Sequence, residues 1–502
     1  MRISIRVDAS SQIGTGHFMR CLTLANELKQ RGALIRFVSR HLPEHLRHML
    51  AAKGHEFMLL SSSPSEAATG DLAHAQWLGT SQHADVQDTI RVLSDQVWDW
   101  LVVDHYALDA EWESALRQIT RNILVIDDLA DRQHDCDVLL DQNLYADMDT
   151  RYTGKVPAHC RLLLGPNYAL LREEFRQLHA QIKLRTGPVK RMLVFFGGVD
   201  ADNYTGRIVK AVANLGIEGL HVDVVIGSQH PSREQIEYEC VQHSFTYHVQ
   251  TDRMAELMAA ADLSIGAGGS AIWERCYLGL PTLTICTADN QHKQIVDAAS
   301  EGLLYAPELK DELVLVVSRH VNALMENGCL RRFISSNGIQ AVDGHGVLRV
   351  AGNLGCSGIE IRTARPDDLQ KLFEWRNHPT VRAASRNPEA INWEDHQKWF
   401  AAVLISPDSL LLIGQREGTP VGVVRFDIQD DEAEVSIYLV PGITESGLGR
   451  DLLQSTEHWF AVNRPGVCKV YAHVLGGNER SQHLFIGMDY QVESTCYSKR
   501  LH

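Results

Sequence analysis

The sequence predicts an α/β protein: a pair of open, parallel-sheet α/β domains followed by a smaller α+β domain. Three observations support this fold class. The chain has 502 residues, and at about 150 residues per domain this length suggests three domains. The first two thirds alternate strand-like and helical stretches, whereas the last third contains strands that pair in antiparallel fashion. An apolar content of 44% and a charged content of 22% are typical of folded globular proteins.

The first predicted domain covers residues 1–185. Strand-like apolar runs occupy residues 3–8, 33–39, 100–106 and 122–128. After the first run, apolar residues recur on one helical face from His17 onward, and Gly32 stands where that helix would end. Such alternation of strands and helices is typical of an open parallel sheet.

The second predicted domain covers residues 186–350. The pattern pauses at residues 183–190, KLRTGPVK, which read as a linker. It then restarts, with strand-like runs within residues 191–203, 222–228, 262–270 and 280–286. Two similar halves predict two Rossmann-like domains with a cleft between them, and ligands of such sheets sit at the carboxyl ends of the strands.

The third predicted domain covers residues 359–502, after a glycine-rich linker, AGNLGCSG, at residues 351–358. It begins with a strand and a helix. Residues 420–429 and 432–441 then read as an antiparallel pair. A glycine loop, a helix, a strand at residues 469–475, another helix and a final strand follow, which together predict an α+β domain.

Charge and cysteine usage exclude several classes of protein. The net charge of −15 argues against a nucleic-acid or anionic-membrane surface, so an anionic substrate would need local donors such as helix N-termini and arginines. The ten cysteines include no C-x-x-C pair, which argues against a disulfide framework and against a zinc site. No signal-peptide pattern and no 18-residue apolar run occur. We therefore expect a cytoplasmic protein; its oligomeric state is not readable from the sequence.

The stretch SSQIGTGHFMR, at residues 10–20, joins the first strand to the first helix, a geometry typical of phosphate or nucleotide sites. A dinucleotide fingerprint fails, because Met19 replaces the third glycine and the second strand ends in Ser39 and Arg40 with no carboxylate for the ribose. His17 stands in the first turn of the helix, where the helix dipole disfavours a protonated imidazole. A neutral histidine there can take a proton from water; the alternative is a capping or packing role.

A second glycine turn lies in the second domain. Gly268, Gly269 and Ser270 join a strand to a helix, and Glu274 follows inside the first turns of that helix. Backbone N–H groups of such a turn bind diphosphate, and a carboxylate one turn on can reach ribose hydroxyls. The alternative is that the glycines only make a tight turn.

Six motifs, in this order and spacing, resemble the nucleotide-sugar hydrolases of pseudaminic acid biosynthesis: GTGHFMRCLTLA, VVDHYALD, VIDDLADRQHDCDVLLDQNL, LLGPNYALLREEF, GAGGSAIWE and ADNQ. The resemblance covers about residues 1–345. It implies a fold similar to that of GT-B glycosyltransferases of the MurG type. It also implies that the chain hydrolyses UDP-2,4-diacetamido-2,4,6-trideoxy-β-L-altropyranose to UDP and free sugar, with inversion at the anomeric carbon.

The same resemblance implies roles for individual residues. His17 would assist the attacking water, and Tyr106 and Asn290 would lie in the sugar site. The residues that bind the UDP-sugar would be Gly14, Gly16, Arg20, Gly268, Gly269, Ser270, Glu274 and Gln291. No metal is required, because donors at helix ends can stabilise the departing UDP.

Two later stretches, SIYLVPGITESGLGR and NERSQHLFIGMDY, resemble the acetyl-CoA site of GNAT N-acetyltransferases across residues 359–502. The resemblance implies acetyl-CoA as co-substrate, bound by Gly447, Leu448, Gly449, Arg450, Asn478 and Ser481. Two positions depart from that family: Thr444 replaces a basic residue or glutamine, and Phe485 replaces the Tyr that protonates the leaving thiolate. Glu434 is a candidate base that acts through water; the alternative is that it is only an exposed carboxylate on a strand. For Gly447 to Gly449, the alternative to an acetyl-CoA loop is a plain surface turn.

The segment IRTARPDDLQKLFEWRNHPTVR, with its E-W-R-N run at Glu374 to Asn377, resembles acetyltransferases that act on the 4-amino group of such UDP-sugars. The sequence therefore predicts a bifunctional enzyme. It would acetylate a UDP-4-amino-4,6-dideoxy-N-acetyl-altrosamine and then hydrolyse the product. Three alternatives stay open: the same chemistry on a legionaminic-type sugar, a true GT-B glycosyltransferase, and a hydrolase regulated by a non-catalytic acetyl-CoA-binding domain.

Overall fold

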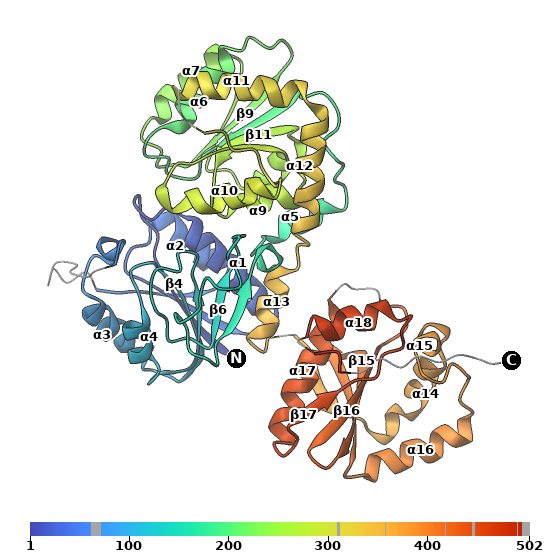
Figure 1. The fold of residues 1–502 in the computed structure, drawn as a ribbon. Helices are drawn as coiled ribbons and strands as arrows, with labels where there is room; N and C mark the ends of the chain where they lie inside the picture. The colour runs from blue at the N-terminus through green and yellow to red at the C-terminus, as the bar shows by residue number, and fades with distance from the viewer. Residues whose placement is uncertain are drawn as a thin grey trace. The chain divides into compact units, whose positions relative to one another are not determined.

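The computed structural model describes residues 1–61, 72–308, 312–356, 358–416, 418–443, 447–488 and 490–493. The chain divides into two compact units, Met1–Val350 and Ala351–His502. The first unit contains two parallel sheets, and the second contains one mixed sheet (Figure 1). Across the described ranges, no helix is both long enough and apolar enough to cross a membrane.

The N-terminal half of the first unit is a seven-stranded parallel sheet in the order β3-β2-β1-β4-β5-β6-β7. Its strands are β1 (Arg2–Val7), β2 (Leu34–Ser39), β3 (Glu56–Leu59), β4 (Trp98–Asp104), β5 (Thr120–Ile126), β6 (Val138–Asp141) and β7 (Arg161–Leu164). Its helices are α1 (Gly16–Gln30), α2 (Glu44–Ala52), η1 (Ala75–Leu78), α3 (Gln82–Leu93) and α4 (Ala110–Leu116). The four predicted strands correspond to β1, β2, β4 and β5. The other three have only four residues each, too few for a clear periodic pattern.

The C-terminal half of this unit is a five-stranded parallel sheet in the order β10-β9-β8-β11-β12. Its strands are β8 (Arg191–Phe195), β9 (His221–Ile226), β10 (Thr246–Val249), β11 (Leu263–Ala267) and β12 (Thr282–Ile285). The short helix η2 (Pro166–Tyr168) follows β7 and belongs to the N-terminal half. The helices of the C-terminal half are α5 (Glu173–His179), α6 (Tyr204–Ala213), α7 (Arg233–Gln242), α8 (Met254–Ala260), α9 (Ala271–Tyr277), η3 (Asp289–Gln291), α10 (His292–Ser300), α11 (Leu313–Glu326) and α12 (Gly328–Ala341). The predicted strands of this half are confirmed, and only β10 was missed.

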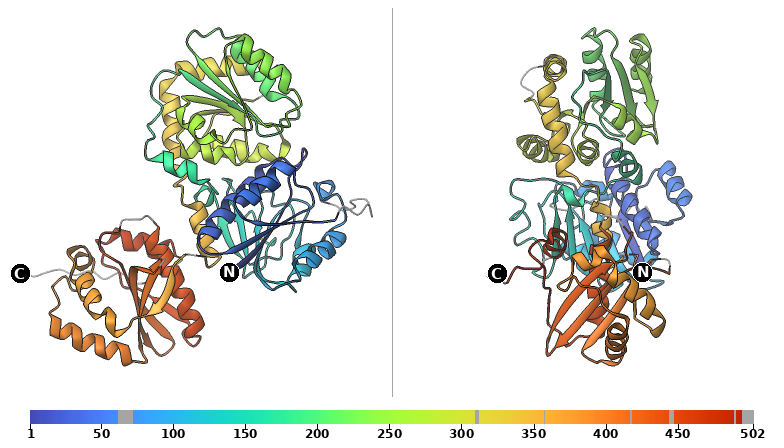
Figure 2. Two further views of the ribbon diagram at one scale, coloured as in Figure 1. Left: turned by 180° about the vertical axis from the view of Figure 1, so that it is seen from behind. Right: turned by 90° about the vertical axis from the view of Figure 1, so that its right-hand side faces the viewer.

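Helices cover both faces of the second sheet. One apolar core joins the sheet to α6, α7 and α11, and another joins it to α8, α9 and α10. Figure 1 shows α6, α7 and α11 on one side of this sheet and α9 and α10 on the other, and Figure 2 shows the same layers from behind and from the side. Because both faces are covered, the strands are nearly continuous apolar runs, as is usual in parallel sheets. The apolar runs of the sequence therefore identified them.

Helix α13 (Gly346–Asn353) returns to the N-terminal half of the first unit. Arg349 Nη1 donates to Asn167 O at 2.6 Å. A Cβ at Gly346 would lie 2.3 Å from Ala169 O, so this close approach needs glycine. The first three residues of the predicted linker, 351–353, are helical, and the two compact units divide between Val350 and Ala351, where that linker begins.

The second unit is a five-stranded sheet in the order β13-β14-β15-β16-β17, antiparallel except for the parallel pair β16–β17. Its strands are β13 (Glu360–Thr363), β14 (Ser409–Arg416), β15 (Thr419–Gln429), β16 (Glu432–Leu439) and β17 (Lys469–Tyr471). Its helices are η4 (Pro366–Asp368), α14 (Leu369–Asn377), α15 (Pro379–Ala383), α16 (Trp393–Ile405), α17 (Leu448–Asn463) and α18 (Glu479–Ile486). The predicted antiparallel pair is confirmed as β15–β16. The predicted final strand falls largely on residues 489 and 494–502, which lie outside the described residues.

Two apolar cores cover the two faces of this sheet. Side chains of α14 and α16 pack on one face, and α17 packs on the other. On the first face, cross-strand register places Asp427 opposite Glu434 and Val423 opposite Tyr438. Polar residues of β15 and β16 therefore share the face that carries α14 and α16.

Candidate active site

His17 lies near the start of the helix that follows the first strand. The chain leaves β1 and turns at Gly14, whose φ of +77° favours glycine. Gly16 begins α1, so His17 is the second residue of the helix. A Cβ at Gly14 or at Gly16 would meet no described atom within 4 Å. The backbone beside His17 is therefore open enough for a ligand to approach.

The imidazole of His17 is held by Asp104, the last residue of β4. Asp104 Oδ1 lies 2.6 Å from His17 Nδ1, and the same carboxylate accepts two bonds from Arg20, at 2.6 and 2.7 Å. Burial alone would raise the pKa of Asp104, but Arg20 and His17 together hold it below its ordinary value. In the neutral ring, a carboxylate oxygen 2.6 Å from Nδ1 favours the proton on that nitrogen, which leaves the lone pair on Nε2.

This arrangement extends the sequence-based interpretation of His17, which considered only the helix terminus. A residue 87 positions away supplies the partner that orients the imidazole. His17 keeps 11% of its side chain exposed, whereas Asp104 is fully buried. The pair therefore has a buried anchor and an accessible ring, the arrangement that a general base needs.

A second carboxylate, Asp128, completes the cluster around Arg20. It accepts a bond from Arg20 Nη1 at 3.0 Å and a short bond from the Tyr106 hydroxyl. Burial and the nearby carboxylate raise the pKa of Tyr106 well above its ordinary value, so its phenol stays protonated and donates. The rings of Tyr106 and His17 pack edge to face, with centroids 4.5 Å apart. The fold thus brings His17, Arg20 and Tyr106 together.

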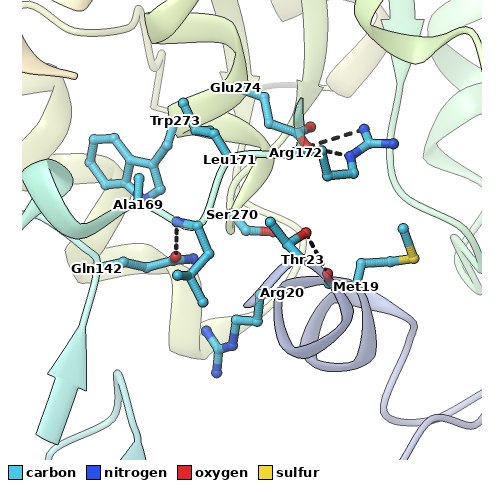
Figure 3. A pocket seen from close by; sticks show the side chains of 11 residues that line it. Met19, Arg20, Thr23, Gln142, Ala169, Leu171, Arg172, Ser270, Trp273 and Glu274 are labelled. Atoms are coloured by element: carbon cyan, nitrogen blue, oxygen red, sulfur yellow. Dashed lines mark hydrogen bonds and ion pairs between the residues drawn. The ribbon is translucent and has the colours of Figure 1, made fainter. Parts of the chain in front are cut away.

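A pocket lies between α1 and α9, one helical turn from His17. Its lining residues are Met19, Arg20, Thr23, Gln142, Ala169, Leu170, Leu171, Arg172, Ser270, Trp273 and Glu274. Figure 3 shows Ser270 and Glu274 entering it from the C-terminal half and Arg20 and Thr23 from the N-terminal half. Both halves of the unit therefore contribute to one site.

Glu274 is paired with an arginine in this pocket, and this pairing was not predicted from the sequence. Its Oε1 accepts bonds from Arg172 Nε at 3.3 Å and Nη2 at 3.2 Å. This pairing raises the pKa of Arg172 against the lowering effect of burial. Because both bonds reach Oε1, the other carboxylate oxygen is left for a ligand.

The second glycine turn has structural reasons to contain glycine. Gly269 has a φ of +80°, and a Cβ at Gly268 would lie 2.9 Å from Ile295 Cδ1 and 3.0 Å from Gln291 Oε1. Gln291 therefore lies directly against the turn. Asn290, its neighbour on η3, is exposed, and no described contact joins it to the residues around His17.

In the second unit, the predicted acetyl-CoA loop is shorter than expected. Helix α17 begins at Leu448, so Gly449 and Arg450 lie in its first turn rather than in a loop. Gly447 precedes the helix with a φ of +86°, and a Cβ there would meet no described atom within 4 Å. The N–H groups of Leu448 and Gly449 precede the first intrahelical bond, which Arg450 donates to Gly447 O. Thr444 lies outside the described residues.

The other predicted acetyl-CoA residues lie at the start of α18. Asn478 Oδ1 accepts from the Ser481 N–H at 3.2 Å, so Asn478 caps this helix. Phe485 is 7% exposed and belongs to the apolar core below α17. Its ring fills space in that core, which accounts for a phenylalanine at this position.

Glu434 lies in the middle of β16 and is 28% exposed at its side chain. Its Oε1 pairs with Arg386 Nη2 at 3.0 Å. Tyr438, two pleats further on the same face, has a pKa that burial raises despite two nearby cations, Arg376 and Arg425. Glu434 therefore lies in a polar environment rather than alone on an exposed strand.

Several residues of these sites were missed from the sequence: Asp104, Asp128, Arg172 and Trp273. Asp104 and Asp128 had a usable signal, because each follows an apolar strand and parallel strands end at one edge of the sheet. Arg172 lies in the motif LLGPNYALLREEF, but nothing in that motif indicates its partner, which is 102 positions away. Within the part of the chain that the structure describes, no group of three or more His, Cys, Asp or Glu is arranged to hold a metal ion.

Two family models match separate parts of this chain. Residues 192–310 match the glycosyltransferase family 28 C-terminal domain, which is the half that contains the second glycine turn. Residues 359–489 match the acetyltransferase (GNAT) domain, which covers the five-stranded mixed sheet. The chain is therefore similar to two different families in two separate parts, a glycosyltransferase C-terminal domain before residue 311 and an acetyltransferase domain after residue 358. The predicted fold class is thereby confirmed.

Three relatives resemble the chain at the level of sequence. An uncharacterized protein of Methanocaldococcus jannaschii is 21% identical across 98% of this chain and 97% of its own length, so its similarity spans the fusion. The UDP-2,4-diacetamido-2,4,6-trideoxy-beta-L-altropyranose hydrolase of Campylobacter jejuni is 25% identical over 60% of this chain and 97% of that protein. The spore coat polysaccharide biosynthesis protein SpsG of Bacillus subtilis is 24% identical over 70% of this chain and 98% of that protein.

The predicted resemblance of the GT-B-like unit to the UDP-sugar hydrolase is therefore confirmed as a sequence relationship. Among solved structures, MurG of Acinetobacter baumannii aligns with 70% of this chain and 99% of its own, at 15% identity and a TM-score of 0.47.

Proposed function

We propose that the chain is a bifunctional enzyme that carries out two consecutive steps on a UDP-linked amino sugar. Residues 359–502 acetylate the 4-amino group of a UDP-4-amino-4,6-dideoxy-N-acetyl-altrosamine. Residues 1–185 and 186–350 then hydrolyse the resulting UDP-2,4-diacetamido-2,4,6-trideoxy-β-L-altropyranose. The observation that carries this proposal is the Asp104–His17 pair, at 2.6 Å, one helical turn from a pocket that both halves of the unit line.

In the proposed hydrolysis, His17 Nε2 takes a proton from water while the water oxygen bonds to the anomeric carbon. The bond from that carbon to the diphosphate oxygen breaks, and UDP leaves as an anion on the opposite face, which inverts the configuration. Asp104 keeps the proton on Nδ1 and stabilises the imidazolium that forms. The acid–base step thus needs only side chains that the fold brings together.

The UDP would bind at the second glycine turn. Backbone N–H groups of Gly269 and Ser270 would hold the diphosphate, and the carboxylate oxygen of Glu274 that Arg172 does not use would accept from a ribose hydroxyl. Gln291 lies against the same turn and would contact the nucleotide. Asn290 would reach the sugar from the exposed side of η3.

The proposed acetyl transfer uses acetyl-CoA held at the start of α17. The open space at Gly447 and the first N–H groups of the helix fit a pyrophosphate, and Asn478 and Ser481 border the site from α18. The amine attacks the thioester carbonyl, a C–N bond forms, and the C–S bond breaks. Glu434 accepts the amine proton through water, and the CoA thiolate takes a proton from solvent.

The relatives support this proposal in two ways. The Campylobacter jejuni relative, which is similar to 60% of this chain, is named for hydrolysis of the same UDP-sugar. The GNAT model covers the second unit. The order of steps follows from chemistry: a sugar pocket shaped for an amide would have to desolvate an ammonium without a matched anion, so acetylation precedes hydrolysis.

The test is mass spectrometry of the products that the full chain forms from the UDP-4-amino sugar, with and without acetyl-CoA. With acetyl-CoA we expect CoA, UDP and the free diacetamido sugar; without it we expect little UDP. The His17→Ala variant should accumulate the acetylated UDP-sugar. Acetyl-CoA that binds without turnover would support the regulatory alternative, and UDP release only in the presence of a sugar acceptor would support a glycosyltransferase.

A further inference from the structure

A buried amide, Asn143, lies just after β6 and is one of several groups that bond the two halves of the first unit to each other. Asn143 is 3% exposed. Its Oδ1 accepts from Trp273 Nε1 at 2.9 Å and from Gln294 Nε2 at 2.8 Å. Its Nδ2 donates to Asp128 Oδ2 at 3.3 Å. A single side chain therefore bonds α9 and α10 of the C-terminal half and a carboxylate of the N-terminal half.

These bonds connect the two parts of the proposed hydrolase site. Trp273 lies one helical turn after Ser270, in the helix that begins at the second glycine turn. On the other side, Asp128 binds Arg20, and Arg20 binds the carboxylate that holds His17. A continuous path of hydrogen bonds thus runs from the proposed nucleotide site to the proposed base.

We propose that Asn143 is a positioning residue of the hydrolase: it fixes the C-terminal half in register with the N-terminal half, so that a UDP-sugar bound on one meets His17 on the other. This inference rests on the proposed function. An amide suits the position, because the site needs an acceptor for two neutral N–H donors and a donor for a carboxylate. A carboxylate lacks the donor, and an aliphatic side chain lacks both.

The discriminating variant is Asn143→Asp. The new carboxylate still accepts from Trp273 and Gln294, but its second oxygen replaces the NH₂ group that faced Asp128. Two carboxylates in contact repel each other unless they share a proton. We expect kcat for UDP release to fall roughly 10- to 100-fold at pH 8, because a small misplacement of reacting groups costs up to about 10²-fold. KM and the inhibition constant for UDP should change less than about threefold, since the direct UDP contacts remain.

The pH profile separates positioning from packing. The ratio of wild-type to variant kcat should shrink as the pH falls toward 5, because a shared proton restores a bond between residues 128 and 143. The control is Asn122→Asp, which alters a half-buried amide whose Nδ2 donates to Asp99 O away from this path. A ratio that does not vary with pH, or an equal loss in the control, would overturn the proposal.

A second measurement needs neither substrate nor turnover. Hydrogen exchange of the ligand-free full chain should be faster in Asn143→Leu at residues 16–20 and, together with them, in α9 and α10. The corresponding Asn122→Leu variant should leave these segments unchanged. Faster exchange in only one half would refute a role in register. If the wild-type chain hydrolyses no UDP-sugar, the proposed function fails, while this exchange result still decides whether Asn143 holds the halves together.

Discussion

Replacing Asp104 with asparagine tests the proposed base most directly. The carboxylate accepts from His17 Nδ1 and, at 2.6 and 2.7 Å, from two nitrogens of Arg20. An asparagine has one acceptor oxygen and one NH₂ group. Arg20 Nε donates to Oδ2 and Arg20 Nη2 donates to Oδ1, so the asparagine loses one of these two bonds in either orientation. When its oxygen stays at the Oδ2 position, its NH₂ group faces His17 Nδ1.

The consequence is a change of tautomer. Nδ1 must accept from the new NH₂ group, the proton moves to Nε2, and the ring no longer has a lone pair toward the pocket. A general base contributes roughly 10²- to 10⁴-fold to the rate, so Asp104→Asn should lower kcat by that factor, or about 3–5 kcal/mol in activation free energy. KM should change little, because the proposed UDP contacts lie in the other half of the unit.

The assay is UDP release by the full chain, with the UDP inhibition constant and the melting temperature as checks of folding. His17→Ala should lose the same factor, and the double variant should lose no more than either single variant, since residues that act as one unit are not additive. The matched control is Cys21→Ala, which removes a thiol 3.4 Å from the Asp104 carboxylate without changing its bonds to His17 and Arg20. A kcat of Asp104→Asn within about threefold of wild type, or losses that add, would refute the reasoning.

Three further predictions concern separate parts of the chain. Glu274→Ala should weaken UDP inhibition of hydrolysis by about 1–3 kcal/mol, because a carboxylate–ribose bond is lost; the inhibition constant measures it. Glu434→Gln should lower acetyl transfer at least tenfold without changing the KM for acetyl-CoA, since the base but not the CoA site is removed; steady-state CoA release measures it. His134 is buried, yet the nearby carboxylate of Asp127, 3.9 Å away, and the hydrogen bond to Glu113 outweigh burial and raise its pKa to about 9. Protonated His134 should therefore stabilise the fold by a total on the order of 3 kcal/mol, and this stabilisation should be complete below about pH 6.5 and lost as the pH rises through 9. Urea unfolding of the full chain between pH 6 and 10 measures the free energy of unfolding.

Each of these predictions has a control or an outcome that contradicts it. Arg172→Gln keeps the Glu274 carboxylate, so it should weaken UDP inhibition less than Glu274→Ala does. An unchanged inhibition constant in Glu274→Ala would mean that UDP binds elsewhere. Acetyl transfer that Glu434→Gln leaves intact would assign the proton to another base. For the pH dependence, His134→Asn should flatten the stability curve, whereas the exposed His48→Asn should not; equal slopes in both variants would contradict the assignment.

The sequence determined the fold class and the position of the glycine turns. Strands that are buried on both faces, such as β4 and β11, are continuous apolar runs and can be recognised from the sequence. The turns at Gly14 and Gly269 can be recognised because a positive φ favours glycine. The short strands β3, β6, β7 and β10 were not predicted, because the pattern of four residues is too short to distinguish a strand from a loop. The glycine content of residues 351–358 did not indicate that α13 extends to Asn353.

Only the tertiary structure decided how the site is assembled. His17 could be recognised from its place in the helix, but its partner Asp104 is 87 residues away, and Glu274 meets Arg172 across 102 residues. Asn143 lies within one of the six motifs, but the motif did not indicate its role, because that role depends on three partners from three different segments. Local patterns report which backbone a segment adopts, whereas the protonation, pairing and orientation of a side chain depend on charges and donors that the fold brings into contact.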